Sequence, residues 1–123
     1  MNSYQIAKNA AEIALSKKAN DVVLMDLRKV SSMADYFLIC SGDVDLHVKA
    51  IVDEIKSQLR DRKVKPWHVE GYQNLSWVLM DYVDVVVHVF RPEMREFYNL
   101  EKLWGDAPVQ NFADGEAESV PSS

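Results

Sequence analysis

The stretch from Trp77 to Phe90 constrains the fold more than any other part of the sequence. Two runs of β-forming residues, 75–82 and 85–90, meet at the short turn Tyr82-Val83-Asp84 and predict a β-hairpin. A strand that is buried on both faces reads as an almost continuous apolar run, whereas these runs also contain Trp77, Asp81 and His88. We therefore expect one face of the hairpin to form a working surface.

The length of the turn decides which side chains of the hairpin share a face. With a connection of two residues (82–83) or four (81–84), Trp77 lies opposite His88 and Leu79 lies opposite Val86. Alternation along the strands then defines a hairpin patch, which we expect to be exposed and to bind a partner: Trp77, Leu79, Asp81, His88 and Phe90. The opposite face is expected to be core: Val78, Met80, Val85, Val87 and Val89. In the alternative interpretation, helices cover both faces and Trp77 belongs to the core.

Up to the end of the hairpin, the pattern predicts helices and strands in the order α-β-β-α-β-β-β, and a short helix is expected after it. Helices are expected at 4–19, at 44–62 with Asp43 as the N-cap, and from Pro92 to about Tyr98, because apolar residues recur there at helical spacing or Pro is placed to start a helix. Strands are expected at 21–27, 36–40, 64–70, 75–82 and 85–90, with Pro66 placing the third at an edge. This order predicts an α/β (α+β) fold, with a mixed sheet of about five strands and helices packed on it.

Composition indicates one domain followed by a tail. The chain has 123 residues, of which 48% are apolar, enough for a single core. We place the domain at 1–108 and a disordered tail at 109–123, which carries Asp114, Glu116 and Glu118 and has no Lys or Arg. The formal net charge is −5, and the body before the tail is also mildly acidic. An acidic surface suits a basic protein better than DNA or another phosphate backbone.

Several further features point to a cytoplasmic protein without a membrane partner. No basic stretch followed by a long apolar run marks a secretory signal, and no apolar run approaches the length of a membrane span. The single cysteine, Cys40, excludes an internal disulfide and is expected to be a buried strand thiol.

Signals of catalysis are few. The sequence has four glycines and no G-x-S-x-G, P-loop or G-x-G-x-x-G motif, and its three histidines lack ligand spacing, so no catalytic residue, cofactor or metal is expected. One carboxylate pair, Asp81 and Asp84, lies at the strand end and turn. The alternative function is therefore a nucleotidyltransferase-like enzyme that holds Mg²⁺ between these two aspartates. Ser41-Gly42 has the right letters for that family but leads into a helix.

Residues from about 4 to 108 resemble the ribosomal silencing factor family (RsfS, also called Iojap) almost end to end. The matching pieces are Ala-Asp-Tyr-Phe at 34–37, His-Val at 47–48, Val-Glu-Gly at 69–71, Trp77, Asp-Tyr-Val-Asp-Val-Val-Val-His-Val-Phe at 81–90, Arg-Glu-Phe-Tyr at 95–98, Leu-Glu at 100–101 and Leu-Trp-Gly-Asp-Ala at 103–107.

The resemblance implies a non-enzymatic factor that binds the large ribosomal subunit through the fourteenth large-subunit protein. Such a factor blocks joining of the small subunit and represses translation when nutrients are short. It also implies a nucleotidyltransferase-like topology without the catalytic set. The hairpin patch then becomes the candidate contact, with Tyr98 beside it, and a homodimer of the free protein could hide that patch.

Overall fold

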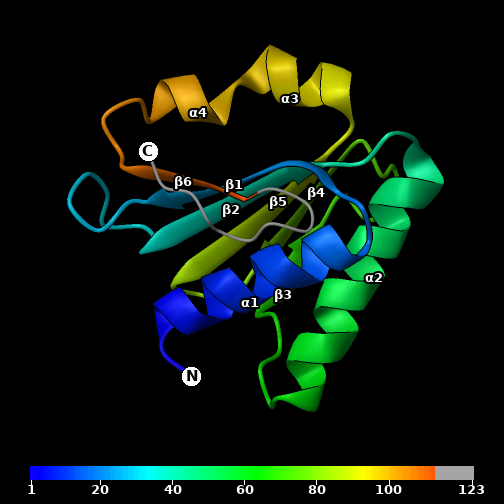
Figure 1. The fold of residues 1–123 in the computed structure, drawn as a ribbon, viewed down its shortest axis with the longest axis horizontal. Coiled ribbons are helices and arrows are strands. Elements are labelled where there is room, and N and C mark those ends of the chain that lie inside the picture. The colour runs from blue at the N-terminus through cyan, green and yellow to red at the C-terminus, as the bar shows by residue number, and fades with distance from the viewer. Residues whose placement is uncertain (113–123) are drawn as a thin grey trace.

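A six-stranded mixed sheet forms the centre of the structure, a computed structural model that describes residues 1–112 (Figure 1). The strands are β1 (Asn20–Asp26), β2 (Tyr36–Ser41), β3 (His68–Glu70), β4 (Trp77–Asp81), β5 (Val85–Phe90) and β6 (Val109–Phe112). They lie in the order β3-β4-β5-β2-β1-β6, and within this sheet only the β2–β5 pair is parallel. The expected mixed α+β class is confirmed, but the sheet has six strands rather than five.

Helices α1 (Ser3–Ser16) and α2 (Asp45–Asp61) cover one side of the sheet, which we call the closed face (Figure 1). Helix α1 begins with a capping box, in which the side chains of Asn2 and Gln5 each accept the other's backbone N–H. Both helices bury small or aliphatic residues at helical spacing, so they pack closely on the strands. The fully buried ones are Ala7, Ala10, Ala11, Ala14, Val48, Ile51, Val52, Ile55 and Leu59.

Helices α3 (Pro92–Tyr98) and α4 (Leu100–Leu103) lie across the other side, which we call the aromatic face; they are drawn above the sheet in Figure 1. Pro92 opens α3, and Asn99 separates the two helices in a left-handed conformation with φ 43°. The smaller core cluster lies under this segment and consists of Val23, Met25, Leu27, Ala34, Phe37, Ile39, Phe90 and Ala107.

The sixth strand corrects the expected domain boundary. Residues 109–112 were expected to begin the disordered tail, but they form β6 and pair antiparallel with β1. Phe112 lies opposite Val22 and is only 8% exposed, within the core of the closed face. The outer edge of β1 would otherwise leave backbone hydrogen-bonding groups unpaired, and β6 supplies their partners. The rest of the expected tail, 113–123 with Asp114, Glu116 and Glu118, lies outside the described residues.

The structure also differs from the sequence-based predictions in three smaller features. Strand β3 spans only three residues, although it does lie at a sheet edge as Pro66 suggested. Val44 rather than Asp43 is the N-cap of α2, and the Asp43 carboxylate instead accepts a hydrogen bond from Asn20 Nδ2 at 2.6 Å. Helix α4 was not anticipated.

Cys40 is buried in β2, as predicted. Burial raises the pKa of its thiol to about 12, so the neutral form is strongly favoured. Among the helices of residues 1–112, none has the length and apolar character that crossing a membrane requires.

Candidate partner-binding surface

The β4–β5 hairpin places the predicted side chains on one face but in a different register. Trp77 pairs with Phe90, Leu79 with His88, and Asp81 with Val86. The predicted direct partners were therefore wrong by two positions, because the turn lies one residue later, at 83–84, where the Tyr82 N–H donates to the Val85 carbonyl at 2.8 Å. A shift of two positions keeps every side chain on its face. The core assignment of the opposite face is confirmed, since Val78, Met80, Val85, Val87 and Val89 are all fully buried.

The members of the hairpin patch differ in accessibility. Trp77, Leu79 and Asp81 are partly buried, and Tyr98 on α3 is 44% exposed. His88 and Phe90, in contrast, are 3% and 0% exposed, so the expectation that they are exposed was wrong. Strand β5 is flanked by β4 and β2, and the 92–104 segment returns over it. The two side chains therefore lie beneath the surface that Trp77 and Tyr98 form.

Trp77 is held from three directions. Its ring stacks on Phe90 with centroids 5.0 Å apart, and Tyr98 packs against it with a centroid distance of 4.6 Å. The indole Nε1–H donates a hydrogen bond to His88 Nδ1 at 3.1 Å. The Trp77 backbone is closely packed as well, since Gly71 has φ +82° and lies so close to the Trp77 carbonyl oxygen that a Cβ would collide with it. These contacts fix the orientation of a large amphipathic ring that is still partly open to solvent.

His88 supports this arrangement as a neutral ring. Burial lowers the pKa of His88 to about 3. Because Nδ1 accepts the bond from Trp77, the proton is assigned to Nε2, which has no hydrogen-bond partner within the described chain. The Phe37 ring packs edge-on against His88, with centroids 4.6 Å apart. His88 therefore orients the Trp77 indole from below.

The two aspartates of the alternative enzyme hypothesis have separate structural roles. Asp81 Oδ1 accepts the Val83 N–H at 2.7 Å, and its Oδ2 lies 3.9 Å from His68 Nδ1. This bond holds a turn in which Val83 has φ 76°, a conformation that β-branched residues rarely adopt. Asp84 is exposed, and its carbonyl accepts the N–H groups of Asp35 and Tyr36.

The described residues contain no metal-binding cluster. Within residues 1–112, no group of three or more His, Cys, Asp or Glu side chains is arranged to hold a metal ion. The three histidines lie apart in their contacts. His47 links Lys17 and Asp43 through its two ring nitrogens, His68 bonds Glu70, and His88 bonds Trp77.

Sequence reasoning missed a set of exposed apolar side chains beside this surface. Phe97 is 77% exposed and packs edge-on against Tyr98, and Leu103 on α4 is 69% exposed. On the other side of β4, Trp67 is 73% exposed and lies edge-on against His68, which faces Asp81 across the β3–β4 pair. Phe97 and Leu103 occupy positions that also fit a core-facing helix, so the sequence alone did not separate them from buried residues.

The sequence is similar to proteins of a known family along nearly its whole length. The model of the family described as "Ribosomal silencing factor during starvation" matches residues 1–123. A ribosomal silencing factor of Bacillus subtilis is 46% identical over 94% of this chain and 98% of its own length. The chloroplastic Iojap protein of Zea mays is 35% identical over 88% of this chain and 46% of its own length.

Solved structures agree with these sequence relatives. A crystal structure of a Chromobacterium violaceum protein has a TM-score of 0.83 and 34% identity, and the match covers 96% of this chain and 98% of that one. One from Bacillus halodurans has a TM-score of 0.72 and 41% identity, with 87% and 94% covered. The chain belongs to the ribosomal silencing factor (RsfS) family.

Proposed function

We propose that this protein binds the large ribosomal subunit at the fourteenth large-subunit protein, prevents the small subunit from joining, and so represses translation under nutrient limitation. The observation that carries the proposal is the oriented, partly open Trp77 ring with Tyr98 against it and Asp81 on the same sheet face. Family membership supports the ribosomal role. The action takes place in the cytoplasm.

The chemistry of this surface suits a basic protein partner. Tryptophan and tyrosine are enriched among residues that dominate binding energy, because they bury a large area with little loss of side-chain freedom. Asp81 supplies negative charge on the same face, and the chain as a whole is acidic. We propose Trp77, Leu79, Asp81 and Tyr98 as direct contacts, with His88 and Phe90 as buried supports that hold Trp77.

The mechanism is steric. Two ribosomal subunits join through contacts spread over a wide face, and a folded 14.1 kDa body at one contact point keeps the others from closing. No chemical step is needed, and we propose that the protein is not an enzyme.

Off the ribosome, we propose that a second copy covers the same apolar side chains in a homodimer. A protein that stays monomeric at high concentration in sedimentation equilibrium would argue against this.

Co-sedimentation with purified large and small subunits tests the proposed contact. We expect Trp77→Ala to weaken binding to large subunits by about 2 kcal/mol or more, roughly 30-fold, as loss of an interface anchor does. Asp81→Lys reverses a charge on the same surface and should slow association, most strongly at low salt. Asp61→Lys at the exposed end of α2 makes the same charge change elsewhere and is the control.

Two outcomes would contradict the proposal. Normal binding by a folded Trp77→Ala protein would move the contact away from the aromatic face. For the enzyme alternative, calorimetry with Mg²⁺ and a nucleoside triphosphate is decisive, and micromolar binding that disappears in Asp84→Ala would refute a purely binding role.

A further inference from the structure

The α3–α4 segment carries part of the proposed binding surface but has little to hold it in place. Neither helix contains a fully buried residue, and they have seven and four residues. Helices this short are not stable without tertiary contacts. Besides the contact of Tyr98 with Trp77, the apolar side chains of this segment that pack on the core beneath it are the partly buried Met94, Leu100 and Trp104. The orientation of Tyr98, at the end of α3, therefore depends on some further attachment.

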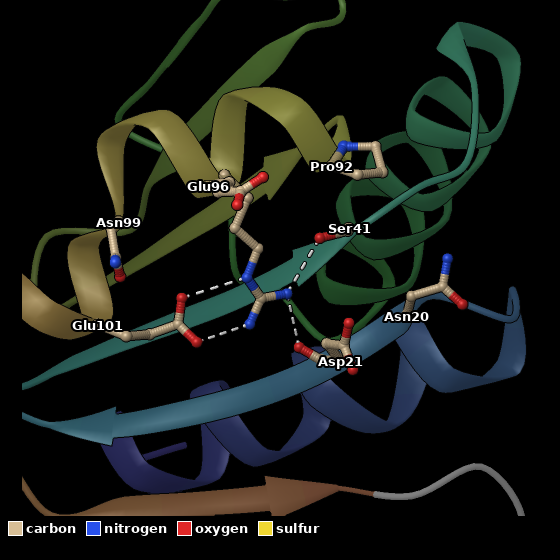
Figure 2. A pocket seen from close by; sticks show the side chains of 8 residues that line it. Asn20, Asp21, Ser41, Pro92, Glu96, Asn99 and Glu101 are labelled. Atoms are coloured by element: carbon tan, nitrogen blue, oxygen red, sulfur yellow. Dashed lines mark hydrogen bonds and ion pairs between the residues drawn. The ribbon is translucent and has the colours of Figure 1, made fainter.

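Arg95 provides that attachment. Its side chain is only 12% exposed and makes four hydrogen bonds to three different segments. Nε and one terminal nitrogen donate to the two carboxylate oxygens of Glu101 on α4, at 3.2 and 2.9 Å. The other terminal nitrogen donates to the Asp21 carbonyl at 2.8 Å and to Ser41 Oγ at 3.0 Å. Figure 2 shows Glu101, Asp21 and Ser41 with the dashed lines that join them to this guanidinium. The four residues help to line a cavity of about 460 Å³.

The sheet is shaped to supply these acceptors. Between Asn20 and Val23 the β1–β2 register shifts, and Asp21 in this irregular stretch has φ 50°. A bulge leaves a residue out of the strand ladder, so the Asp21 carbonyl can accept from Arg95 instead of from a neighbouring strand. Ser41 is the last residue of β2 and is 3% exposed. Two separate strand ends thus converge on one arginine.

The sharp bend between the two helices completes the attachment. Asn99 ends α3 with φ 43°, and its side chain accepts the Lys102 N–H at 3.1 Å to begin α4. This bend lets Glu101, six residues after Arg95, reach back to form a bidentate ion pair. Tyr98 lies between the arginine and the bend, so its backbone is fixed on both sides.

We propose that Arg95 is a positioning residue for partner binding: it fixes α3 and α4 to the ends of β1 and β2 so that Tyr98 stays packed on Trp77. The proposal rests on the proposed function for its partner. Arg95 itself does not need to touch the ribosome. Its effect on binding passes through the Tyr98–Trp77 contact, whose centroid distance is 4.6 Å.

The test compares Arg95→Met with Arg28→Met. Arg28 also forms a two-bond pair with a carboxylate, that of Asp26, but it lies after the opposite end of β1. Both variants remove one positive charge. In Arg95→Met we expect amide hydrogen exchange at 93–104 to become at least about tenfold faster, while β2 and α2 stay protected. Binding of large subunits should weaken by about tenfold, whereas Arg28→Met should leave both measurements unchanged.

A double-mutant comparison separates positioning from direct contact. If Arg95 acts through Tyr98, then Arg95→Met should weaken binding no further in a Tyr98→Ala background. A further loss in that background would overturn the proposal, and so would unchanged exchange at 93–104 in Arg95→Met. If wild-type protein fails to bind large subunits, the proposed function is refuted, and the inference falls with it. If wild type and Arg95→Met bind equally well, only the inference is refuted.

Discussion

The two faces of the sheet are built from different kinds of side chain. The closed face is mainly aliphatic, and α1 and α2 pack over it. The aromatic face carries Phe37, Trp77, His88 and Phe90, and the short α3–α4 segment covers it only in part. Burial on the closed face supports the fold, whereas on the aromatic face Trp77 and Leu79 remain partly exposed. The comparison predicts that equivalent truncations on the two faces have different consequences.

The largest expected effect comes from truncating the closed face. Ile55 is fully buried between α2 and the sheet, so Ile55→Ala should lower the free energy of unfolding by about 2–5 kcal/mol. Leu79→Ala on the aromatic face is the matched change and should cost only about 1 kcal/mol, because part of that side chain is already exposed. Urea unfolding measures both. Similar losses for the two variants would show that the faces do not differ as described.

The second prediction concerns the edge of the closed face. Phe112 on β6 is 8% exposed, and Phe112→Ala should lower the free energy of unfolding by about 3 kcal/mol. A chain ending at Pro108 loses β6 altogether and should be destabilised at least as much. Thermal unfolding of both variants checks this, with truncation after Phe112 as the control. An unchanged melting temperature after truncation at Pro108 would mean that β6 adds nothing to the fold.

The smallest effect should appear on the aromatic face as a dependence on pH. Folded His88 has its pKa lowered to about 3, whereas in the unfolded chain the pKa is about 6.5. Between these values the unfolded state binds more protons, so the stability from His88 is complete above pH 6.5 and is lost as pH falls. From pH 6.5 to 5 the loss should be about 1.5 kcal/mol, and His88→Gln should remove it.

His68→Gln serves as the control for this measurement, because His68 is the partly exposed histidine of the same sheet face. Urea unfolding at several pH values follows all three proteins. Equal slopes for wild type and His88→Gln between pH 6.5 and 5 would contradict a buried, neutral His88.

Local periodicity was sufficient to predict most of the closed face. The apolar stripe of α2 and the alternation in β4 and β5 identify their buried sides directly, because each pattern has the period of its element. Even an error in turn position left the faces correct, since it moved the register by two residues. These are properties that a short window of sequence contains.

The aromatic face and the sheet edge depend on contacts that local sequence patterns do not show. Strand β6 has only four residues and is stabilised by pairing with β1, far earlier in the chain. The burial of His88 and Phe90 results from the return of the 92–104 segment over β5. Arg95 and Glu101 are six residues apart, a spacing that brings no two side chains together on one regular helix. Only the bend at Asn99 makes them neighbours.

The parallel β2–β5 pair also has a consequence for the order in which the protein folds. The strands β1 and β2 are close in sequence, as are β3, β4 and β5, so each group can form as a local meander. Joining the groups requires β2 to pair with β5, which begins more than forty residues later in the sequence. Helix α2 lies between the two strands in the chain. We expect this long loop closure to limit the folding rate, with β6 docking on β1 afterwards. Kinetic φ-values near one at Phe112 would contradict that order.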